Sequence, residues 1–576
     1  MDTPTQKQRQ ASARSTARKH KSERNMNQAA EGVIGLSPLV GVRSEDLSDA
    51  MKTTVRQLAK QPLIAAKHTL GYAAKLVDVV AGKTDYTVAK RDRRFADESW
   101  RESRIFSRLL QGYLALDESF SEWVDELDLD ELDERKARFI VDILTDSLAP
   151  TNTLLTNPSA LKKARATRGR SLVQGLRHAI EDIRHNNAMP AQVDKSQFKV
   201  GENLATTEGS VVFRNEILEL IQYRPTTAKV QQRPLLVVPP QINKFYVFDL
   251  SPEKSMFKFL VEQGLQLFAV SWRNPTVEHR HWGMDDYISS LTEAVDAIQA
   301  ITGQPTLNLM GACSGGITTS ILAGYMDAAG EEAINSLTTL VCVLSQRQED
   351  SDITLFANNA GIEKARRSSQ KKGVLDGKDL AKIFNWMRPN DLIWNYVVNN
   401  YLLGNTPPAF DILYWNNDTT CLPAQLHSDF LDQLQANPLV TAGDLTVLDK
   451  PIDLTSLDCD KYMVAGVTDH ITPWHACYRS TQFMPGNIRF VLSNSGHIQA
   501  LVNPPGNAKS NYFTNDSLPP SHDEWLQGAE QQMGTWWDDW SAWLLQRSGR
   551  KINARKNLGK KGSFDPMEAA PGTYVY

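Results

Sequence analysis

The sequence predicts an α/β fold, in which a mostly parallel sheet with helices on both faces follows a separate helical domain. Short apolar runs alternate with helical patterns from about residue 206 onward, whereas residues 44–187 show helical periodicity alone. The chain has 576 residues, 41% of them hydrophobic and 23% charged. This length allows about two to four folding units, and the composition excludes a fibrous or wholly disordered protein.

The predicted sheet begins with a hairpin and continues with buried parallel strands. Val211–Phe213 and Ile217–Tyr223 are runs of strand-forming residues on either side of a polar turn. The later runs are short and continuously apolar, as expected where helices cover both faces of a parallel sheet. These strands are predicted at Leu235–Val238, Leu265–Trp272, Leu307–Met310, Thr338–Leu344, Tyr462–Ala465 and Ile488–Leu492.

Helices are predicted between these strands from their caps and their apolar faces. Ser251 and Pro252 suit the N-cap and the first residue of a helix that ends at Gly264. Asp285–Ile301 places its apolar residues on one face, and a further helix starts near Gly315. A C-terminal helix carries an apolar stripe that we expect to pack in the core, formed by Trp536, Trp540, Trp543 and Leu544.

The spacing of the strands predicts an insertion late in the sheet. Roughly 115 residues separate the strand that ends near Ser345 from the one at Tyr462, whereas a crossover needs only a few tens. We therefore expect an aromatic-rich lid or cap at about residues 346–455. The full predicted organisation is a disordered basic tail (1–30), a helical domain (31–205) and a catalytic domain with the lid inserted (206–576).

Charge and cysteine content exclude several classes of protein. The net charge is −4, but Met1–Arg24 and Arg547–Lys561 are both strongly basic, and such runs are most often solvated, disordered tails. Basic charge at the ends of the chain, not on a folded face, argues against nucleic-acid binding. The five cysteines form no CxxC pair and no disulfide framework, which favours a reducing compartment. The histidine spacings predict no metal site.

No membrane span or secretory signal is predicted. The N-terminus lacks the apolar run of a signal sequence. The longest uncharged stretch, Ile301–Met326, contains glycines, a proline and hydroxyl residues, and it is better explained as a strand, a tight turn and a helix.

That turn carries the strongest chemical signal in the chain. Gly311-Ala-Cys313-Ser314-Gly315 lies between a predicted strand and a predicted helix, which is the arrangement of a nucleophile elbow with sulfur in place of oxygen. The helix behind the turn offers the amide of Ser314 and a positive dipole end, and both favour a thiolate and an oxyanion. The alternative is a buried structural cysteine beside a tight turn.

A catalytic cysteine needs a histidine and an orienting carboxylate. His497 lies just after a late strand, and Asp469 follows the strand before it. The order Cys313, Asp469, His497 is the chain order of the α/β-hydrolase fold, and it predicts that fold here. Asp469 has an alternative role as the cap of its own loop. The second oxyanion donor is expected in the loop Pro239–Lys244 beyond Pro240, and we assign it to the amide of Ile242.

With these residues identified, the chain resembles a known family, the single-subunit polyhydroxyalkanoate synthases, and within it the medium-chain (class II) group. The similarity extends from about Asp97 to the C-terminus. It is carried by several long motifs: PTNTLLTNP (150–158), PPQINKFYVFDLSPEKS (239–255), GACSGG (311–316), MRPNDLIWNYVVNNYLLGNTPPAFDILYWNNDTT (387–420), TDHITPW (468–474), SGHIQALVNPP (495–505) and APGTYVY (570–576).

The resemblance implies an acyltransferase that polymerises (R)-3-hydroxyacyl-CoA, releases coenzyme A and needs no further cofactor. It implies that Cys313 is the nucleophile, Asp469 the acid and His497 the general base. His470, Arg388, Asn243 and Trp415 are weaker candidates for contacts with the acyl-CoA or for support of the triad. The family also implies a cytoplasmic enzyme at the surface of the polymer granule, a homodimer, and phasin-type granule proteins as partners of the helical domain.

Sulfur suits this reaction for a physical reason. An acyl group transferred from coenzyme A to Cys313 remains a thioester, so it keeps the activation that the next hydroxyl group needs. Two other functions stay open at this point. The first is a cysteine-type hydrolase, either a depolymerase or a thioesterase, and the second is a granule-coating protein with a degenerate site.

Overall fold

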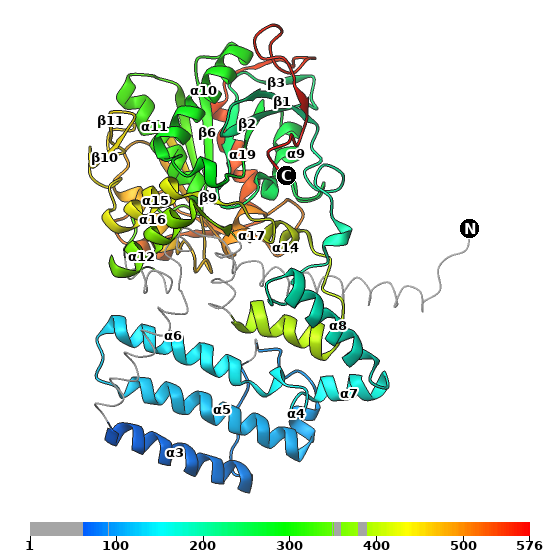
Figure 1. The fold of residues 1–576 in the computed structure, drawn as a ribbon. Helices are drawn as coiled ribbons and strands as arrows, with labels where there is room; N and C mark the ends of the chain where they lie inside the picture. The colour runs from blue at the N-terminus through cyan, green and yellow to red at the C-terminus, as the bar shows by residue number, and fades with distance from the viewer. Residues whose placement is uncertain (1–61, 90–91, 348–349, 351–358, 378–388) are drawn as a thin grey trace.

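The computed structural model describes residues 62–89, 92–347, 350, 359–377 and 389–576. The predicted basic tail at residues 1–30 and the candidate Arg388 lie outside this part of the chain. Within it, the chain forms a layer of helices and, above it, a large sheet with helices on both faces (Figure 1).

The N-terminal region is helical throughout its described length. Its longest members pack side by side (Figure 1), and Trp100 and Tyr113 belong to a small apolar core of this region. Asp130 caps one helix by accepting from the amide of Asp133, and acidic residues fill the first turn, where they favour the helix dipole. The helices are α3 (Pro62–Ala81), α4 (Ser99–Glu102), α5 (Arg104–Asp125), α6 (Glu131–Leu148), α7 (Pro158–Ala166) and α8 (Arg170–His185).

The sheet has eleven strands in the order β15-β14-β13-β12-β7-β6-β4-β5-β2-β1-β17. Its centre, from β13 to β5, is parallel, and antiparallel strands lie at both edges. The strands are β1 (Gly209–Arg214), β2 (Leu218–Tyr223), β4 (Leu235–Val238), β5 (Leu267–Trp272), β6 (Leu307–Ala312), β7 (Ile334–Leu340), β12 (Asp460–Gly466), β13 (Ile488–Ser493), β14 (Asn511–Thr514), β15 (Glu530–Met533) and β17 (Glu568–Ala569).

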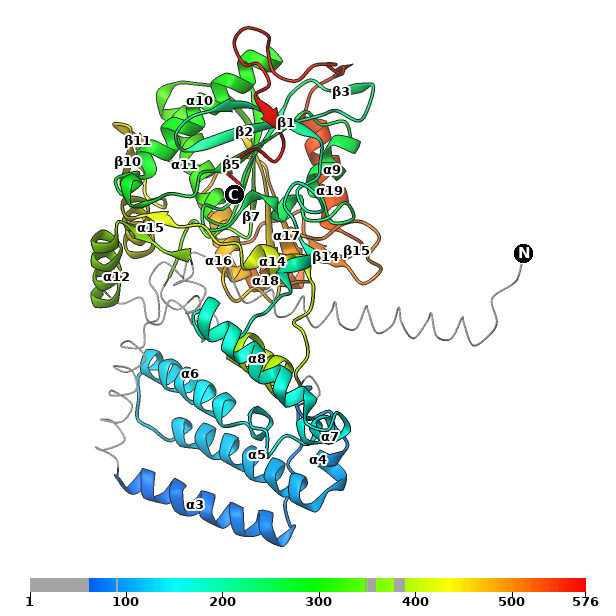
Figure 2. The same cartoon turned by 45° about the vertical axis from the view of Figure 1, so that its right-hand side comes forward.

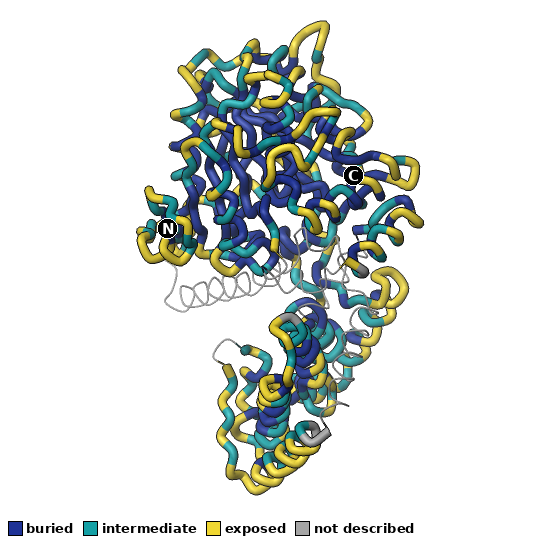
Figure 3. Tube along the Cα trace, turned by 90° about the vertical axis from the view of Figure 1, so that its left-hand side faces the viewer, coloured by how far each residue is buried: buried dark blue, intermediate teal, exposed yellow. Residues whose placement is uncertain are grey.

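Successive side chains along each strand point to opposite faces of the sheet, and they pack in two apolar cores, one on each face. Leu236 and Val238 of β4 pack with helices α10 (Met284–Thr302) and α11 (Ser314–Ala329). Leu235 and Val237 pack on the other face with α9 (Met256–Glu262) and α19 (Trp536–Arg547). Figure 3 shows buried residues concentrated in this part of the molecule. The tryptophan stripe of α19 is buried there, as predicted.

Several predicted boundaries are wrong, and each error has a local cause. Helix α9 begins at Met256, because Ser255, not Ser251, is its N-cap and accepts from the amide of Lys258. Strand β7 ends at Leu340, because Val341 adopts a φ of 44° and leaves the extended conformation, although its amide still donates to the carbonyl of Val464 in β12. The apolar residues after it, predicted as strand, are buried in a core outside the sheet.

The C-terminal basic segment is folded, which corrects the expectation of a solvated tail. Arg547 forms an ion pair with Asp460, and strand β16 (Lys551–Asn553) pairs with β3 (Lys229–Gln231). The edge strands β14, β15 and β17 were not predicted, because each has at most four residues and lacks a continuous apolar run.

A long segment with its own elements separates β7 from β12, within the range predicted for the insertion. Two of its pieces are π-helical, a rare geometry often found at functional sites. The elements are α12 (Asn359–Lys372), β8 (Val374–Leu375), η8 (Asn390–Trp394), η9 (Val397–Leu402), α14 (Asp411–Asn416), β9 (Leu422–Pro423), α15 (Ala424–Ala436), β10 (Leu445–Val447) and β11 (Lys450–Ile452).

Among the described helices, none combines the length and the hydropathy needed to cross a membrane.

Candidate active site

Cys313 lies at the sharp turn between β6 and α11, with φ 51° and ψ −121°. This backbone geometry is strained for a residue with a side chain, and it is typical of a nucleophile elbow. The glycines of the motif make the turn possible. A methyl group on Gly315 would come within 2.6 Å of the carbonyl oxygens of Val238 and Pro239, and one on Gly316 would be 2.8 Å from Sγ of Cys342.

His497 and Asp469 form a buried pair at the same edge of the sheet. His497 is the first residue of α17 (His497–Leu501), just after β13, and Asp469 lies in the loop after β12. Nδ1 of His497 lies 2.7 Å from Oδ2 of Asp469. Since the carboxyl ends of β6, β12 and β13 meet at one edge, the structure brings the three predicted triad residues to the same place.

Asp469 is fixed by its own loop as well as by the histidine. Oδ1 accepts from the amides of Ile471 (2.9 Å) and Thr472 (3.0 Å), and Oδ2 accepts from the hydroxyl of Thr472 (2.7 Å). The carboxylate therefore caps its loop and orients His497 at once, so the two roles considered from the sequence coexist. Thr472 was not predicted; its place three residues after Asp469 is the only sequence signal for it.

The electrostatics of the pair favour charge separation. Burial alone would lower the pKa of His497, but the charge and hydrogen bond of Asp469, helped by Cys313, raise it to about 10. Burial alone would raise the pKa of Asp469, but His497 and Thr472 outweigh it, and the net direction is down. Nε2 of His497 is buried and has no hydrogen-bond partner within the described residues, so it is available to a neighbouring thiol.

The amides predicted for an oxyanion hole have no competing partners. The neighbouring amide of Gln241 is already engaged, since it donates to Oγ of Ser314 at 3.2 Å. The amides of Ile242 and Ser314 donate no hydrogen bond to any group in the described chain. Ile242 follows β4 and Ser314 opens α11, so both lie beside the elbow.

The weaker candidates have different surroundings. Trp415 is fully buried, and its indole donates to the carbonyl of Lys244, so it supports the loop after β4. Asn243 is buried in that loop and bridges to Thr419. His470 follows Asp469 and is half-buried.

Two more cysteines, missed by the sequence analysis, are buried near the elbow. Burial raises the pKa of the Cys342 thiol well above its ordinary value, and Cys313 adds to the effect. The same holds for Cys477, whose Sγ lies 3.5 Å from the carbonyl of Thr472. Both thiols are therefore kept neutral.

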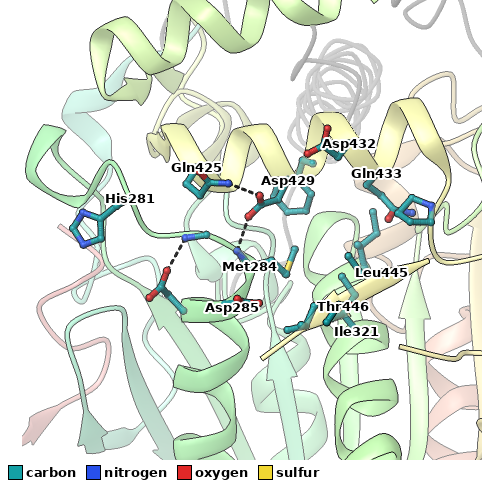
Figure 4. A pocket seen from close by; sticks show the side chains of 16 residues that line it. His281, Met284, Asp285, Ile321, Gln425, Asp429, Asp432, Gln433, Leu445 and Thr446 are labelled. Carbon is teal, nitrogen blue, oxygen red and sulfur yellow. Dashed lines mark hydrogen bonds between the residues drawn. The ribbon is translucent and has the colours of Figure 1, made fainter. Parts of the chain in front are cut away.

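A separate cavity of about 440 Å³ lies between α10, α11, α15 and β10 (Figure 4). Its carboxylates already have structural roles: Asp429 accepts from the amide of Met284 and from Gln425, and Asp286 caps Gly283. Within the described residues, no group of three or more His, Cys, Asp or Glu side chains is arranged to hold a metal ion.

The fold and this edge of the sheet define an enzyme of the α/β-hydrolase fold class, and residues 234–504 match that family. Residues 91–260 match the family described as "Poly-beta-hydroxybutyrate polymerase (PhaC) N-terminus". Among curated relatives, poly(3-hydroxyalkanoate) polymerases 1 and 2 of Ectopseudomonas oleovorans are each 48% identical, over 95% and 93% of this chain and 98% and 96% of their own lengths. The polymerase subunit of Cupriavidus necator is 38% identical over 96% of this chain and 92% of its own length.

The chain belongs to the poly(3-hydroxyalkanoate) polymerases. It is an acyltransferase that polymerises hydroxyalkanoate units into polyester, and the family expected from the sequence motifs is confirmed.

Proposed function

We propose that this enzyme polymerises (R)-3-hydroxyacyl-CoA through a covalent thioester on Cys313, with release of coenzyme A. The observation that carries the proposal is the placement of a strained cysteine elbow beside a buried His497–Asp469 pair. In this proposal coenzyme A belongs to the substrate and no other cofactor takes part.

In the first half of the cycle, Nε2 of His497 takes the proton from Sγ of Cys313, and the thiolate attacks the thioester carbonyl. The raised pKa of His497 favours the imidazolium, so this transfer forms a thiolate–imidazolium pair beside Asp469 before the thioester is attacked. The amides of Ile242 and Ser314 donate to the oxygen that becomes negative. Coenzyme A then leaves as a thiol with the proton from His497, and the acyl group remains on sulfur.

In the second half, His497 takes the proton from the 3-hydroxyl of the next monomer. The alkoxide attacks the acyl-Cys313 carbonyl, an oxoester forms, and the Cys313 thiolate leaves. Because a thioester is converted to an ester, this step is downhill. Asp469 holds Nδ1 of His497 throughout and fixes the tautomer that each proton transfer needs.

Burial of the site supports polymerisation over hydrolysis. Cys313 is 1% exposed and His497 is fully buried, and the insertion with Trp415 lies against the loop after β4. A site that excludes water protects the acyl-enzyme from hydrolysis.

The remaining features are proposed from the family. We infer a cytoplasmic enzyme at the surface of its polymer granule that acts as a homodimer, with phasin-type proteins as partners. We also infer a preference for medium-chain monomers, in keeping with the similarity to the E. oleovorans polymerases.

The test follows free coenzyme A and precipitated polymer together, with purified protein and 3-hydroxyacyl-CoAs of graded chain length. We expect the two products in proportion, and Cys313→Ala is expected to make neither. Release of free hydroxy acid without polymer would instead identify a hydrolase. Undiminished polymer from Cys313→Ala would exclude the nucleophile.

A further inference from the structure

The loop that carries Ile242 is held from outside the sheet by the insertion. The hydroxyl of Thr420 donates to the carbonyl of Gln241 at 2.6 Å, and its amide donates to the carbonyl of Ile242 at 2.9 Å. Thr420 is 2% exposed. One residue of the insertion therefore fixes the two peptide units that decide where the Ile242 amide points.

Neighbouring contacts extend this attachment along the loop. Trp415 donates to the carbonyl of Lys244 at 2.7 Å, and Asn243 forms an antiparallel bridge with Thr419. Beyond the loop, the hydroxyl of Tyr246 donates to Asp418 at 2.6 Å. Residues 241–244 are thus bound to the segment 415–420 at each position.

The insertion is anchored in turn on α8 of the N-terminal region, which lies beside it in Figure 2. Gly175 lets the two backbones approach so closely that a methyl group there would overlap the carbonyl of Tyr401. Next to this contact, the hydroxyl of Tyr401 donates to Asp182 at 2.9 Å, and Nδ1 of His178 lies 3.2 Å from the carbonyl of Asn400.

A second attachment follows α8 in the chain. Gln192 donates to the carbonyl of Leu392 at 3.0 Å and accepts from Asn417 at 3.3 Å. The amide of Asp194 donates to the carbonyl of Pro408 at 3.1 Å. The N-terminal region therefore contacts the insertion both ahead of residues 415–420 and within them, and these residues hold the loop 241–244.

We propose that Thr420 is a positioning residue for acyl transfer, and that α8, through Gly175, sets the place of the insertion on which Thr420 stands. The proposal rests on the proposed function, because it takes the amide of Ile242 as an oxyanion donor. It gives the N-terminal helices a part in the reaction although they contribute no group to the site.

Two reactions of the Cys313 thiol, acyl transfer and alkylation, distinguish a positioning role of Thr420 from a general disruption of the active site. Acyl transfer from a thioester passes through an oxyanion and depends on correctly placed donors. Alkylation of Cys313 by iodoacetamide forms no oxyanion, so it reports only the thiol and its histidine. A positioning residue of the oxyanion loop affects the first reaction and leaves the second unchanged.

The first experiment compares Thr420→Val with Thr420→Ser in the full-length enzyme. We expect Thr420→Val to lower kcat about tenfold or more with KM little changed, because the lost contact acts on the transition state. Alkylation of Cys313 should stay within about twofold of wild type, and Thr420→Ser should restore most of kcat, because it keeps the donor.

The matched control is Thr302→Val. Thr302 is also buried and donates to a backbone carbonyl, that of Ile298, at 2.7 Å within α10. This variant should keep the wild-type kcat. Wild-type turnover in Thr420→Val, or an equal fall in turnover and alkylation, would overturn the role of Thr420.

The second experiment introduces Gly175→Ala, with Gly71→Ala in α3 as its control, since nothing lies within 4 Å of a methyl group there. Alanine strengthens a helix, so a loss of kcat cannot come from weakening α8. We expect Gly175→Ala to lower kcat and to leave alkylation unchanged. In the double variant with Thr420→Val, the two losses should be less than additive, because both displace one loop.

Wild-type turnover in Gly175→Ala, or fully additive losses, would overturn the role of α8. Failure of the proposed function would look different: iodoacetamide would then label wild-type Cys313 without stopping polymer formation.

Discussion

Cys313 combines a backbone geometry that costs free energy with a side chain that the fold keeps from water. A positive φ at a residue other than glycine is tolerated here because Gly311, Gly315 and Gly316 leave room for the turn. The amide of Cys313 is also tied to the carbonyl of Leu340 at 2.9 Å. The neighbouring thiols of Cys342 and Cys477 are buried and neutral, so they do not compete as nucleophiles.

At this scale we predict the effect of replacing sulfur with oxygen. Cys313→Ser should lower the rate of elongation by about two orders of magnitude or more, because an oxoester on serine loses the activation that the next hydroxyl needs. The rates of coenzyme A release and polymer growth measure the change. Elongation at the wild-type rate would contradict the need for a thioester, and circular dichroism shows whether the variant is folded.

A second prediction concerns the pH dependence of stability from the buried pair. The pKa of Asp469 is lowered from 3.8, so its contribution is present above about pH 4 and is lost as the pH falls below it. The pKa of His497 is raised from 6.5 to about 10, so its contribution is complete below 6.5 and is lost as the pH rises through about 10.

Asp469→Asn should therefore reduce the free energy of unfolding most between about pH 4 and 6.5, with a smaller difference on either side. Thermal unfolding of both proteins across this range measures it. A constant difference at every pH would mean that the pair is not charged in the folded protein. The same variant should lower kcat roughly a thousandfold or more, because the tautomer of His497 is no longer fixed.

The strands of the sheet differ in how well the sequence predicts their bounds. Buried parallel strands such as Leu235–Val238 are continuous apolar runs, and β4 has those predicted bounds. Residues 338–344 form a similar run, but only its first part is strand, since an apolar run signals burial and not the direction of the backbone. The short edge strands β14 and β15 depend on their neighbours in the sheet, so no local pattern predicts them.

The placement of Cys313, Asp469 and His497 at one edge of the sheet was predictable, because a nucleophile elbow fixes both residue type and chain order. The attachment of Thr420 to the loop after β4 was not, because its partners are backbone carbonyls that any sequence supplies. The contact between α8 and the insertion was not predictable either, because it depends on packing between residues far apart in the chain.

Strand β12 offers a prediction at the scale of an element. Lys461 at its start is fully buried, and its ammonium donates to the carbonyls of Leu457 (2.5 Å), Cys459 (2.7 Å) and Pro485 (2.7 Å). Burial lowers the pKa of Lys461. Lys461→Met keeps the length of the side chain but leaves three carbonyls without a donor.

We expect Lys461→Met to reduce the free energy of unfolding by about 2–4 kcal/mol, because buried acceptors lose their partner. Denaturant-induced unfolding measures the change. The folded fraction should retain kcat, since Lys461 lies at the amino end of β12 and the site at its carboxyl end. A variant as stable as the wild type would contradict this account of β12.

At the scale of the whole molecule, residues 573–576 are hydrogen-bonded to strand β2 and to the segment that precedes the sheet. Glu219 of β2 is fully buried and accepts from the amides of Thr573 (3.1 Å) and Tyr574 (3.0 Å), and Arg214 pairs with it. The hydroxyl of Tyr576 reaches the carbonyl of Val200 at 3.1 Å. The last residues thereby stabilise the edge of the sheet.

Glu219→Ala should therefore lower the melting temperature by several degrees, because it leaves the amides of Thr573 and Tyr574 without their acceptor and removes one of the two carboxylates that pair with Arg214, the other being Glu568; a loss of about 2–4 kcal/mol is expected. Deletion of residues 571–576 should have a similar effect, and combining the two changes should add little, since both break one attachment. Differential scanning calorimetry measures all three proteins. Full additivity would show that the tail is held elsewhere.

The central claim is that the growing acyl group is held on Cys313, and trapping the acyl-enzyme tests it most directly. An acyl-CoA without the 3-hydroxyl group can acylate the enzyme but offers no hydroxyl for elongation. Peptide mass spectrometry after removal of released coenzyme A should find the acyl mass on Cys313, labile to hydroxylamine and absent from Cys313→Ala. An acyl group on a different residue, in an enzyme that still forms polymer from the hydroxylated substrate, would contradict the account.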